Sequence, residues 1–163
     1  MNDEMKTIRE LLDVPAESRA AALESWLSEQ PDGEQGPRAL AEALAAMANE
    51  PYRVEGSNAD TAQSAFIEAE GLCYVLDEAA EKCDDPRLQA ELWTHASWSA
   101  LITGQLADLP YAYSKRAVKA NPGSDEAWSV YAESIRSETT DFFDDAQTLC
   151  VLAKRGELPA DVP

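Results

Sequence analysis

The side chains that could carry out chemistry are few in this sequence of 163 residues. His95 is its only histidine, so a metal site with two histidine ligands, such as HExxH, cannot form. A cysteine nucleophile would need His95 as its base, and nothing in the sequence places Cys73 or Cys150 beside that ring. The sequence therefore predicts no catalytic residue.

Acidic residues at helical spacing are the other candidates for a site. Asp141 and Asp145 are four residues apart and could hold a divalent ion, but carboxylates at a helix start also complement the helix dipole without one. The glycine-containing turns DGEQG and NPG lack the flanking strand of a phosphate-binding loop. We expect no metal, no cofactor and no enzymatic activity.

Basic residues are concentrated in one place. Lys115, Arg116 and Lys119 fall on one short predicted helix, in a chain with 13 basic and 31 acidic residues. They are either a solvated helix face that pairs with acidic neighbours or a contact site for an acidic peptide or carboxylate group. The net charge of −18 disfavours direct binding to nucleic acid and to anionic membranes.

The ends and the cysteines of the chain indicate where it works. No run of about 18 apolar residues could cross a membrane, and the acidic N-terminus has no apolar segment typical of a secretion signal. Three cysteines without a CxxC pair are typical of reduced core thiols. We expect a cytoplasmic protein.

Helices must position all of these residues. Apolar side chains recur every three or four residues, and no segment alternates as a strand would. This pattern predicts an all-α fold of about eight helices in stacked antiparallel hairpins, over residues 2–12, 15–29, 38–49, 59–82, 86–106, 110–120, 124–137 and 140–155. Asp85 and Ser124 are predicted helix caps, and Gly71 is expected to allow close packing of a neighbouring helix.

The length favours one α-helical domain over residues 1–163. The longest irregular connection runs from Glu50 to Asn58, with Pro51 and Gly56 in it. We place an internal division there, with N-terminal helices in residues 1–56 and helical hairpins in residues 57–163.

One stretch in the C-terminal half resembles a known repeat. Trp128, Tyr131, Ala132 and Ile135 have the W-x2-L-G-x2-Y spacing of tetratricopeptide repeats, and Trp93 lies one repeat length earlier. The resemblance covers residues 88–158, with Pro110 as a departure from the pattern. It implies two hairpins of a right-handed helical repeat, and another α-helical bundle that happens to contain this spacing is the alternative.

The resemblance also implies a groove. In such repeats the first helix of each pair lines it, and in this chain those positions include His95, Trp98, Ser99 and Ser129. Trp98 is either a core residue or an anchor for a partner peptide. The predicted partner-binding residues are therefore Trp98, His95, Lys115, Arg116, Lys119 and Ser129.

Two functions without catalysis follow from these features. The first is a small acidic adaptor or chaperone that binds another protein through a groove or a helix face. The second is an inhibitory, immunity or anti-defence protein whose acidic surface mimics nucleic acid and blocks a basic site on a nuclease, toxin or defence complex. An enzyme with an unrecognised site is a third alternative. The alanine-rich segment LAEALAAMA fits a bundle core or the seam of a homodimer equally well.

Overall fold

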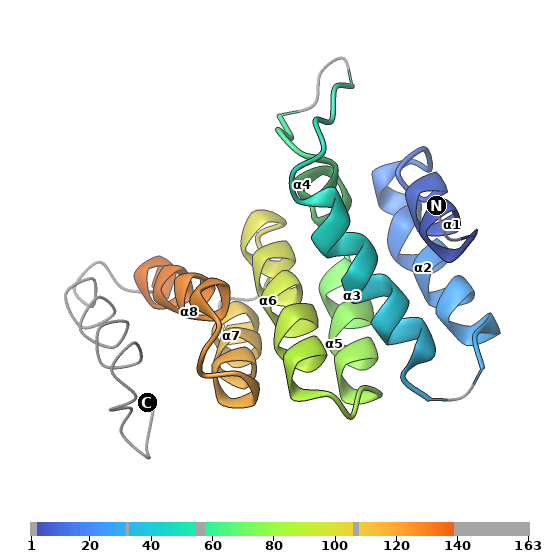
Figure 1. The fold of residues 1–163 in the computed structure, drawn as a ribbon. Helices are drawn as coiled ribbons and strands as arrows, with labels where there is room; N and C mark the ends of the chain where they lie inside the picture. The colour runs from blue at the N-terminus through green and yellow to red at the C-terminus, as the bar shows by residue number, and fades with distance from the viewer. Residues whose placement is uncertain (1–2, 32, 55–57, 106–107, 139–163) are drawn as a thin grey trace.

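The computed structural model describes residues 3–31, 33–54, 58–105 and 108–138 (Figure 1). These residues form eight α-helices and no β-strand, so the predicted all-α class is confirmed. The helices are α1 (Asp3–Glu10), α2 (Ala16–Glu29), α3 (Gln35–Met47), α4 (Ala62–Ile67), α5 (Leu72–Glu81), α6 (Pro86–Ile102), α7 (Asp108–Ala120) and α8 (Asp125–Glu138).

From α5 to α8 successive helices pack side by side, whereas in the N-terminal half α1 packs on α3, and α2 packs on α5 (Figure 1). The longest described helix, α6, lies in the middle of the stack and packs against α3, α4, α5, α7 and α8. Its start is fixed by Asp85, whose side chain accepts a hydrogen bond from the Arg87 backbone N–H at 2.9 Å, and by Pro86 in its first turn. The predicted cap at Asp85 is confirmed.

The end of α6 is set by a glycine. Gly104 has a φ of 67°, and the Gln105 backbone N–H reaches back to the Ala100 carbonyl at 3.0 Å. This is the Schellman arrangement, in which a left-handed residue closes the last helical turn. The helix therefore ends at Ile102 and not at the predicted Leu106.

The predicted long helix over residues 59–82 is wrong. The chain forms two helices there, α4 and α5, because Gly71 between them has a φ of 77°, which no α-helix can contain. A β-carbon at Gly71 would lie 3.7 Å from the Cβ of Ala20, an ordinary contact. Gly71 is therefore needed for its backbone conformation and not for close packing.

A buried arginine fastens α4 to the N-terminal helices. The Arg19 guanidinium donates hydrogen bonds to the carbonyls of Leu12, Val14 and Ala65. The first two carbonyls lie in the connection between α1 and α2, and the third lies in α4. One side chain thus holds the short α4 in place.

Two clusters of apolar side chains form the interior. The larger draws buried residues from α1 to α7, including Ile8, Leu44 and Tyr113, so it extends across residue 56, where we placed the internal division. The smaller lies between α7 and α8 and contains Ala117, Val118, Ala127, Trp128 and Tyr131. Among the described residues, Trp93 of α6 is the one that packs against both clusters.

Two of the residues that carry the repeat resemblance, Trp128 and Tyr131, are interior residues of the α7–α8 hairpin. Trp128 is buried and donates its indole N–H to the Pro122 carbonyl at 2.8 Å. Its ring meets the Tyr131 ring edge-on, with centroids 5.8 Å apart. Ser124 accepts a hydrogen bond from the Ala127 backbone N–H, as a helix cap does.

A tetratricopeptide-type repeat stays a prediction, since no repeat period is assigned to this stack. The helix predicted over residues 140–155 and the acidic residues Asp141 and Asp145 lie outside the described part of the chain.

Candidate functional site

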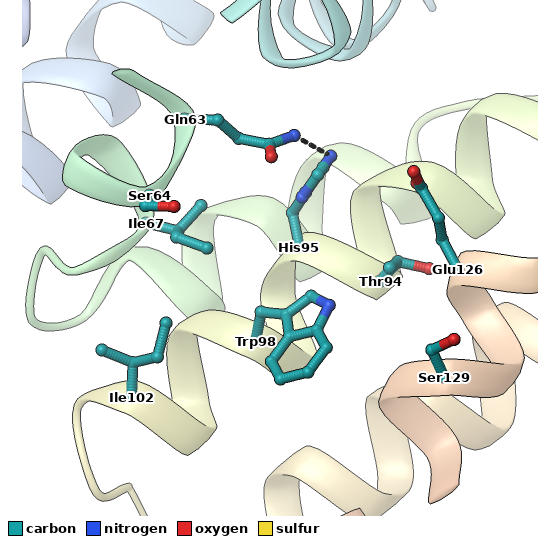
Figure 2. A pocket seen from close by; sticks show the side chains of 9 residues that line it. All are labelled: Gln63, Ser64, Ile67, Thr94, His95, Trp98, Ile102, Glu126 and Ser129. Carbon is teal, nitrogen blue, oxygen red and sulfur yellow. Dashed lines mark hydrogen bonds between the residues drawn. The ribbon is translucent and has the colours of Figure 1, made fainter. Parts of the chain in front are cut away.

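A pocket of about 330 Å³ opens between α4, α6 and α8 (Figure 2). Each of these helices supplies one wall. Its lining residues are Gln63, Ser64 and Ile67 of α4, Thr94, His95, Trp98 and Ile102 of α6, and Glu126 and Ser129 of α8.

The central wall of the pocket is one face of α6. Thr94, His95, Trp98 and Ile102 are separated by one, three and four residues, the spacing that places side chains on the same side of an α-helix. Because the caps at Asp85 and Gly104 fix both ends of α6, this face is held as a rigid surface.

One end of the pocket is apolar. Ile102 is 49% exposed, and the partly exposed Trp98 ring packs on the larger core cluster and projects into the pocket (Figure 2). Ile67, on α4, is buried beside them. Apolar side chains that are open to solvent inside a hollow are typical of a binding site.

His95 and Gln63 form the polar middle. The Gln63 amide nitrogen donates to the Leu44 carbonyl and lies 3.2 Å from His95 Nε2. Since an amide nitrogen can only donate, His95 Nε2 accepts this hydrogen bond, and the imidazole proton is therefore on Nδ1. His95 Nδ1 is buried without a partner, while the Gln63 amide oxygen points into the pocket (Figure 2).

Burial decides the charge of His95. The side chain is only 4% exposed, and this burial lowers the pKa of the imidazole to about 4. His95 is therefore neutral near pH 7.

The other end of the pocket is acidic. Glu126 lines it from α8, and Glu91 lies one turn before Thr94 and His95 on the same face of α6. Burial, with a smaller contribution from the charges of Glu126 and of Glu42 on α3, raises the pKa of Glu91 to about 7. The pocket thus runs from an apolar end at Ile102 to the carboxylate of Glu126, and Glu91 lies one helical turn before Thr94, outside the lining residues.

Three of the predicted partner-binding residues, His95, Trp98 and Ser129, line this one pocket. Ser129 is exposed at the rim, where its hydroxyl donates to the Asp125 carbonyl at 2.8 Å. The expected groove position Ser99 is wrong, because its side chain is fully buried and does not line the pocket.

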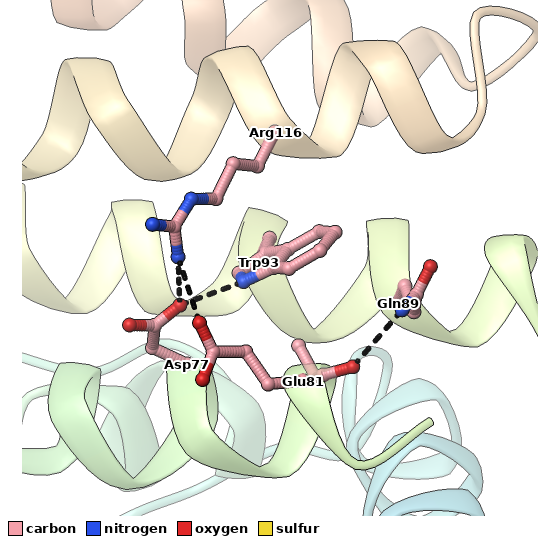
Figure 3. A network of polar contacts seen from close by, with 6 residues as sticks. Asp77, Glu81, Gln89, Trp93 and Arg116 are labelled. Carbon is pink, nitrogen blue, oxygen red and sulfur yellow. Dashed lines mark hydrogen bonds and ion pairs between the residues drawn. The ribbon is translucent and has the colours of Figure 1, made fainter. Parts of the chain in front are cut away.

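The other three, Lys115, Arg116 and Lys119, lie on α7, which contributes nothing to the pocket. Arg116 forms ion pairs with Asp77 at 2.8 Å and Glu81 at 3.4 Å and lies over the Trp93 ring (Figure 3). The Trp93 indole N–H donates to the same Asp77 oxygen at 2.8 Å. Arg116 thus joins α5, α6 and α7 at the surface of the protein, where its charge is already paired.

The two lysines are less engaged. Lys115 lies over the Tyr111 ring at 5.7 Å, and Lys119 is exposed in the last turn of α7. The predicted basic surface is therefore made of two lysines beside a structural arginine.

Sequence reasoning missed Gln63 and Glu126 as lining residues, and it missed Glu91 next to the pocket. Glu91 could have been found by extending the face of His95 and Trp98 by one helical turn. Gln63 could not, because the predicted long helix hid the short α4 that presents it.

Within the described residues, no group of three or more histidine, cysteine, aspartate or glutamate side chains is arranged to hold a metal ion. None of the described helices has both the length and the apolar character that a membrane crossing requires. Comparison of the chain with protein-family models, with curated proteins and with solved structures finds no match.

Proposed function

We propose that this protein is a non-catalytic adaptor or chaperone that binds a segment of another protein in the pocket between α4, α6 and α8. The observation that carries the proposal is the exposed apolar surface of Trp98 and Ile102, set in a hollow beside polar groups that can fix a ligand's orientation. Partly exposed tryptophans in pockets are the residue type that contributes most to protein recognition.

The chemistry of the pocket supports binding over catalysis. The pKa of its histidine, His95, is about 4, and no serine or cysteine accompanies this ring as a hydrogen-bonded nucleophile among the described residues. We also propose a reducing, cytoplasmic setting, because Cys73 and Cys83 are buried free thiols.

Position-specific photo-crosslinking in the native cytosol tests the proposal. A crosslinking amino acid at Ile102, which is 49% exposed, should capture a discrete partner. The same group at Tyr74 on α5 is the matched control, because Tyr74 is 50% exposed and outside the pocket. Ser129→Trp, which fills the pocket from its exposed rim, should abolish capture at Ile102. Equal capture at both positions, or capture that survives Ser129→Trp, would contradict the proposal.

A second function is supported by the net charge of −18. An acidic protein of this size can occupy a basic nucleic-acid site on an enzyme, and its charge would speed association. In that case binding of the captured partner should weaken steeply between about 0.05 and 0.5 M NaCl, and DNA or RNA should compete. Binding through the pocket's apolar end should change little over the same range.

A further inference from the structure

The amide of Gln63 is held in one orientation at the pocket wall. Its nitrogen donates one hydrogen to the Leu44 carbonyl of α3 at 3.2 Å and the other to Nε2 of His95 on α6, also at 3.2 Å. Because a carbonyl can only accept, turning the amide round would set its oxygen against that of Leu44. The contacts to two neighbouring helices therefore keep the Gln63 nitrogen in the wall.

The amide oxygen of Gln63 is left for a ligand. It points into the pocket (Figure 2), and no hydrogen bond is donated to it by any described residue. It is also not one of the buried polar atoms that lack a partner, so it is open to solvent. A hydrogen-bond acceptor of fixed direction is the kind of polar group that orients a ligand in an otherwise apolar pocket.

Neighbouring side chains of the lining present acceptors as well. Thr94 donates its hydroxyl hydrogen to the Ala90 carbonyl at 2.7 Å, and Ser129 donates its own within α8. Glu126 adds a carboxylate. Around Gln63 these side chains complement an N–H group of a ligand better than a second acceptor.

The apolar surface lies close to this acceptor. Trp98 follows His95, which holds the Gln63 amide, by three residues on α6, or about 4.5 Å along the helix axis. One residue of a bound chain can meet both, with its backbone N–H at Gln63 and its own side chain on Trp98. A backbone N–H is free to donate in this way where the segment forms no helix of its own.

We propose that the partner binds through one apolar residue of an extended segment. The backbone N–H of that residue donates to Gln63 Oε1, and its side chain packs on Trp98. In this arrangement His95 does not touch the ligand and is a positioning residue, since its Nε2 holds the Gln63 amide.

This inference rests on the proposed function, and backbone N-methylation of bound peptides tests it. Peptides of about a dozen residues are selected from a phage-displayed random library on the wild-type protein and synthesised with a methyl group on one backbone nitrogen at a time. Each methyl group removes one donor. At one apolar residue it should weaken binding by roughly ten-fold, as measured by calorimetry.

Two glutamine variants assign that loss to one acceptor. Gln63→Met keeps the length of the side chain without its oxygen, so the same methyl group should weaken binding by less than about two-fold. Gln89→Met on α6 is the matched control and should keep the ten-fold effect. Gln89 is also half-buried and donates to a backbone carbonyl, that of Ala80 at 3.3 Å, but lies outside the pocket.

The orientation of Gln63 can be measured without a ligand. Because His95 is the only histidine, the imidazole nitrogens of the nitrogen-15-labelled protein give one pair of NMR signals. Near pH 7 these signals should show the hydrogen on Nδ1 and none on Nε2. A hydrogen on Nε2 would mean that the Gln63 oxygen faces His95, and would overturn the inference.

Failures of the two proposals can be told apart. Peptides that need Trp98 but tolerate a methyl group at every backbone nitrogen would overturn the inference and leave the pocket as a binding site. A ten-fold loss that persists in Gln63→Met would place the donated hydrogen bond elsewhere and would overturn it too. Peptides whose binding is unaffected by both Trp98→Ala and Ser129→Trp would refute the proposed function itself.

Discussion

Two residues one turn apart on α6 have pKa values displaced in opposite directions. Burial raises the pKa of Glu91 to about 7 and lowers that of His95 to about 4. Both shifts disfavour charge on the same helix face, because both side chains are largely removed from water. The contributions of these two residues to stability therefore change with pH in opposite directions.

Glu91→Gln should increase stability above neutral pH. The folded protein binds the Glu91 proton more tightly than the unfolded chain, whose glutamate has a pKa near 4.5. The contribution of Glu91 is therefore complete below about pH 4.5 and is lost as the pH rises through 7. Urea unfolding should show a free energy of unfolding about 1 kcal/mol higher than wild type at pH 8, a value reduced for partial exposure, and no difference at pH 4. An equal difference at both pH values would contradict this.

The variant His95→Gln should remove a loss of stability that occurs at low pH. The unfolded chain binds the His95 proton near its ordinary pKa of 6.5, whereas the folded state resists protonation until about pH 4. The stability that neutral His95 provides is complete above pH 6.5 and is lost as the pH falls below it. The variant should therefore lose less stability than wild type between pH 6.5 and 4, in the same urea experiment.

The basic residues of α7 should contribute unequally to the free energy of unfolding. Arg116→Ala should lower the free energy of unfolding by about 1 kcal/mol, because it removes two ion pairs and the contact with the Trp93 ring. Lys119→Ala is the control, since no ion pair involves Lys119 within the described residues. Denaturation of the two variants side by side checks this, and equal losses would argue against the network in Figure 3.

At the scale of the helices, the break between α4 and α5 is the feature that the sequence concealed. The apolar period continues through Gly71 almost unchanged, so periodicity predicts one helix. The positive φ of Gly71, the residue before α5, keeps α4 and α5 from joining into one helix, and a glycine in the sequence permits such a φ without requiring it. Helix existence follows from local pattern, whereas a break inside an unbroken pattern depends on tertiary packing.

Gly71→Ala distinguishes the two structures by the sign of its effect. With the observed φ of 77°, alanine should destabilise the protein by roughly 1 to 2 kcal/mol. In a continuous helix the same change would stabilise it by about 1 kcal/mol. Gly123→Ala, at a glycine without a positive φ, should have little effect in the same thermal or urea unfolding measurement.

The candidate site was predictable in part for the same reason. His95, Trp98 and Ser129 follow from helical spacing and the repeat resemblance. Ser99 was misplaced because it is the next residue on α6, one hundred degrees round the helix from Trp98 and inside the core. The effect of the Glu42 and Glu126 charges on the pKa of Glu91 depends on the packing of three separate helices, and no local sequence pattern predicts that packing.

At the scale of the whole molecule, the net charge of −18 should weaken the folded state at low ionic strength. Raising NaCl from about 0.01 to 0.5 M shortens the screening length from roughly 30 Å to about 4 Å. We expect the free energy of unfolding to rise by about 1 kcal/mol or more, measured in urea so that the denaturant adds no salt. KCl at equal ionic strength should act alike, and a decrease would show that favourable ion pairs outweigh the repulsion.

The unequal size of the two interior clusters has a consequence for motion. Trp93 is the one described residue that packs against both, and α8 contributes no buried apolar residue to the larger cluster. Amide hydrogens of α8 should therefore exchange with solvent sooner than those of α6, because opening this helix exposes less buried surface. Since α8 also forms a wall of the pocket, a ligand that contacts Glu126 would slow the exchange of the α8 amides without any change of shape. Slower exchange would then reveal binding through the loss of motion alone.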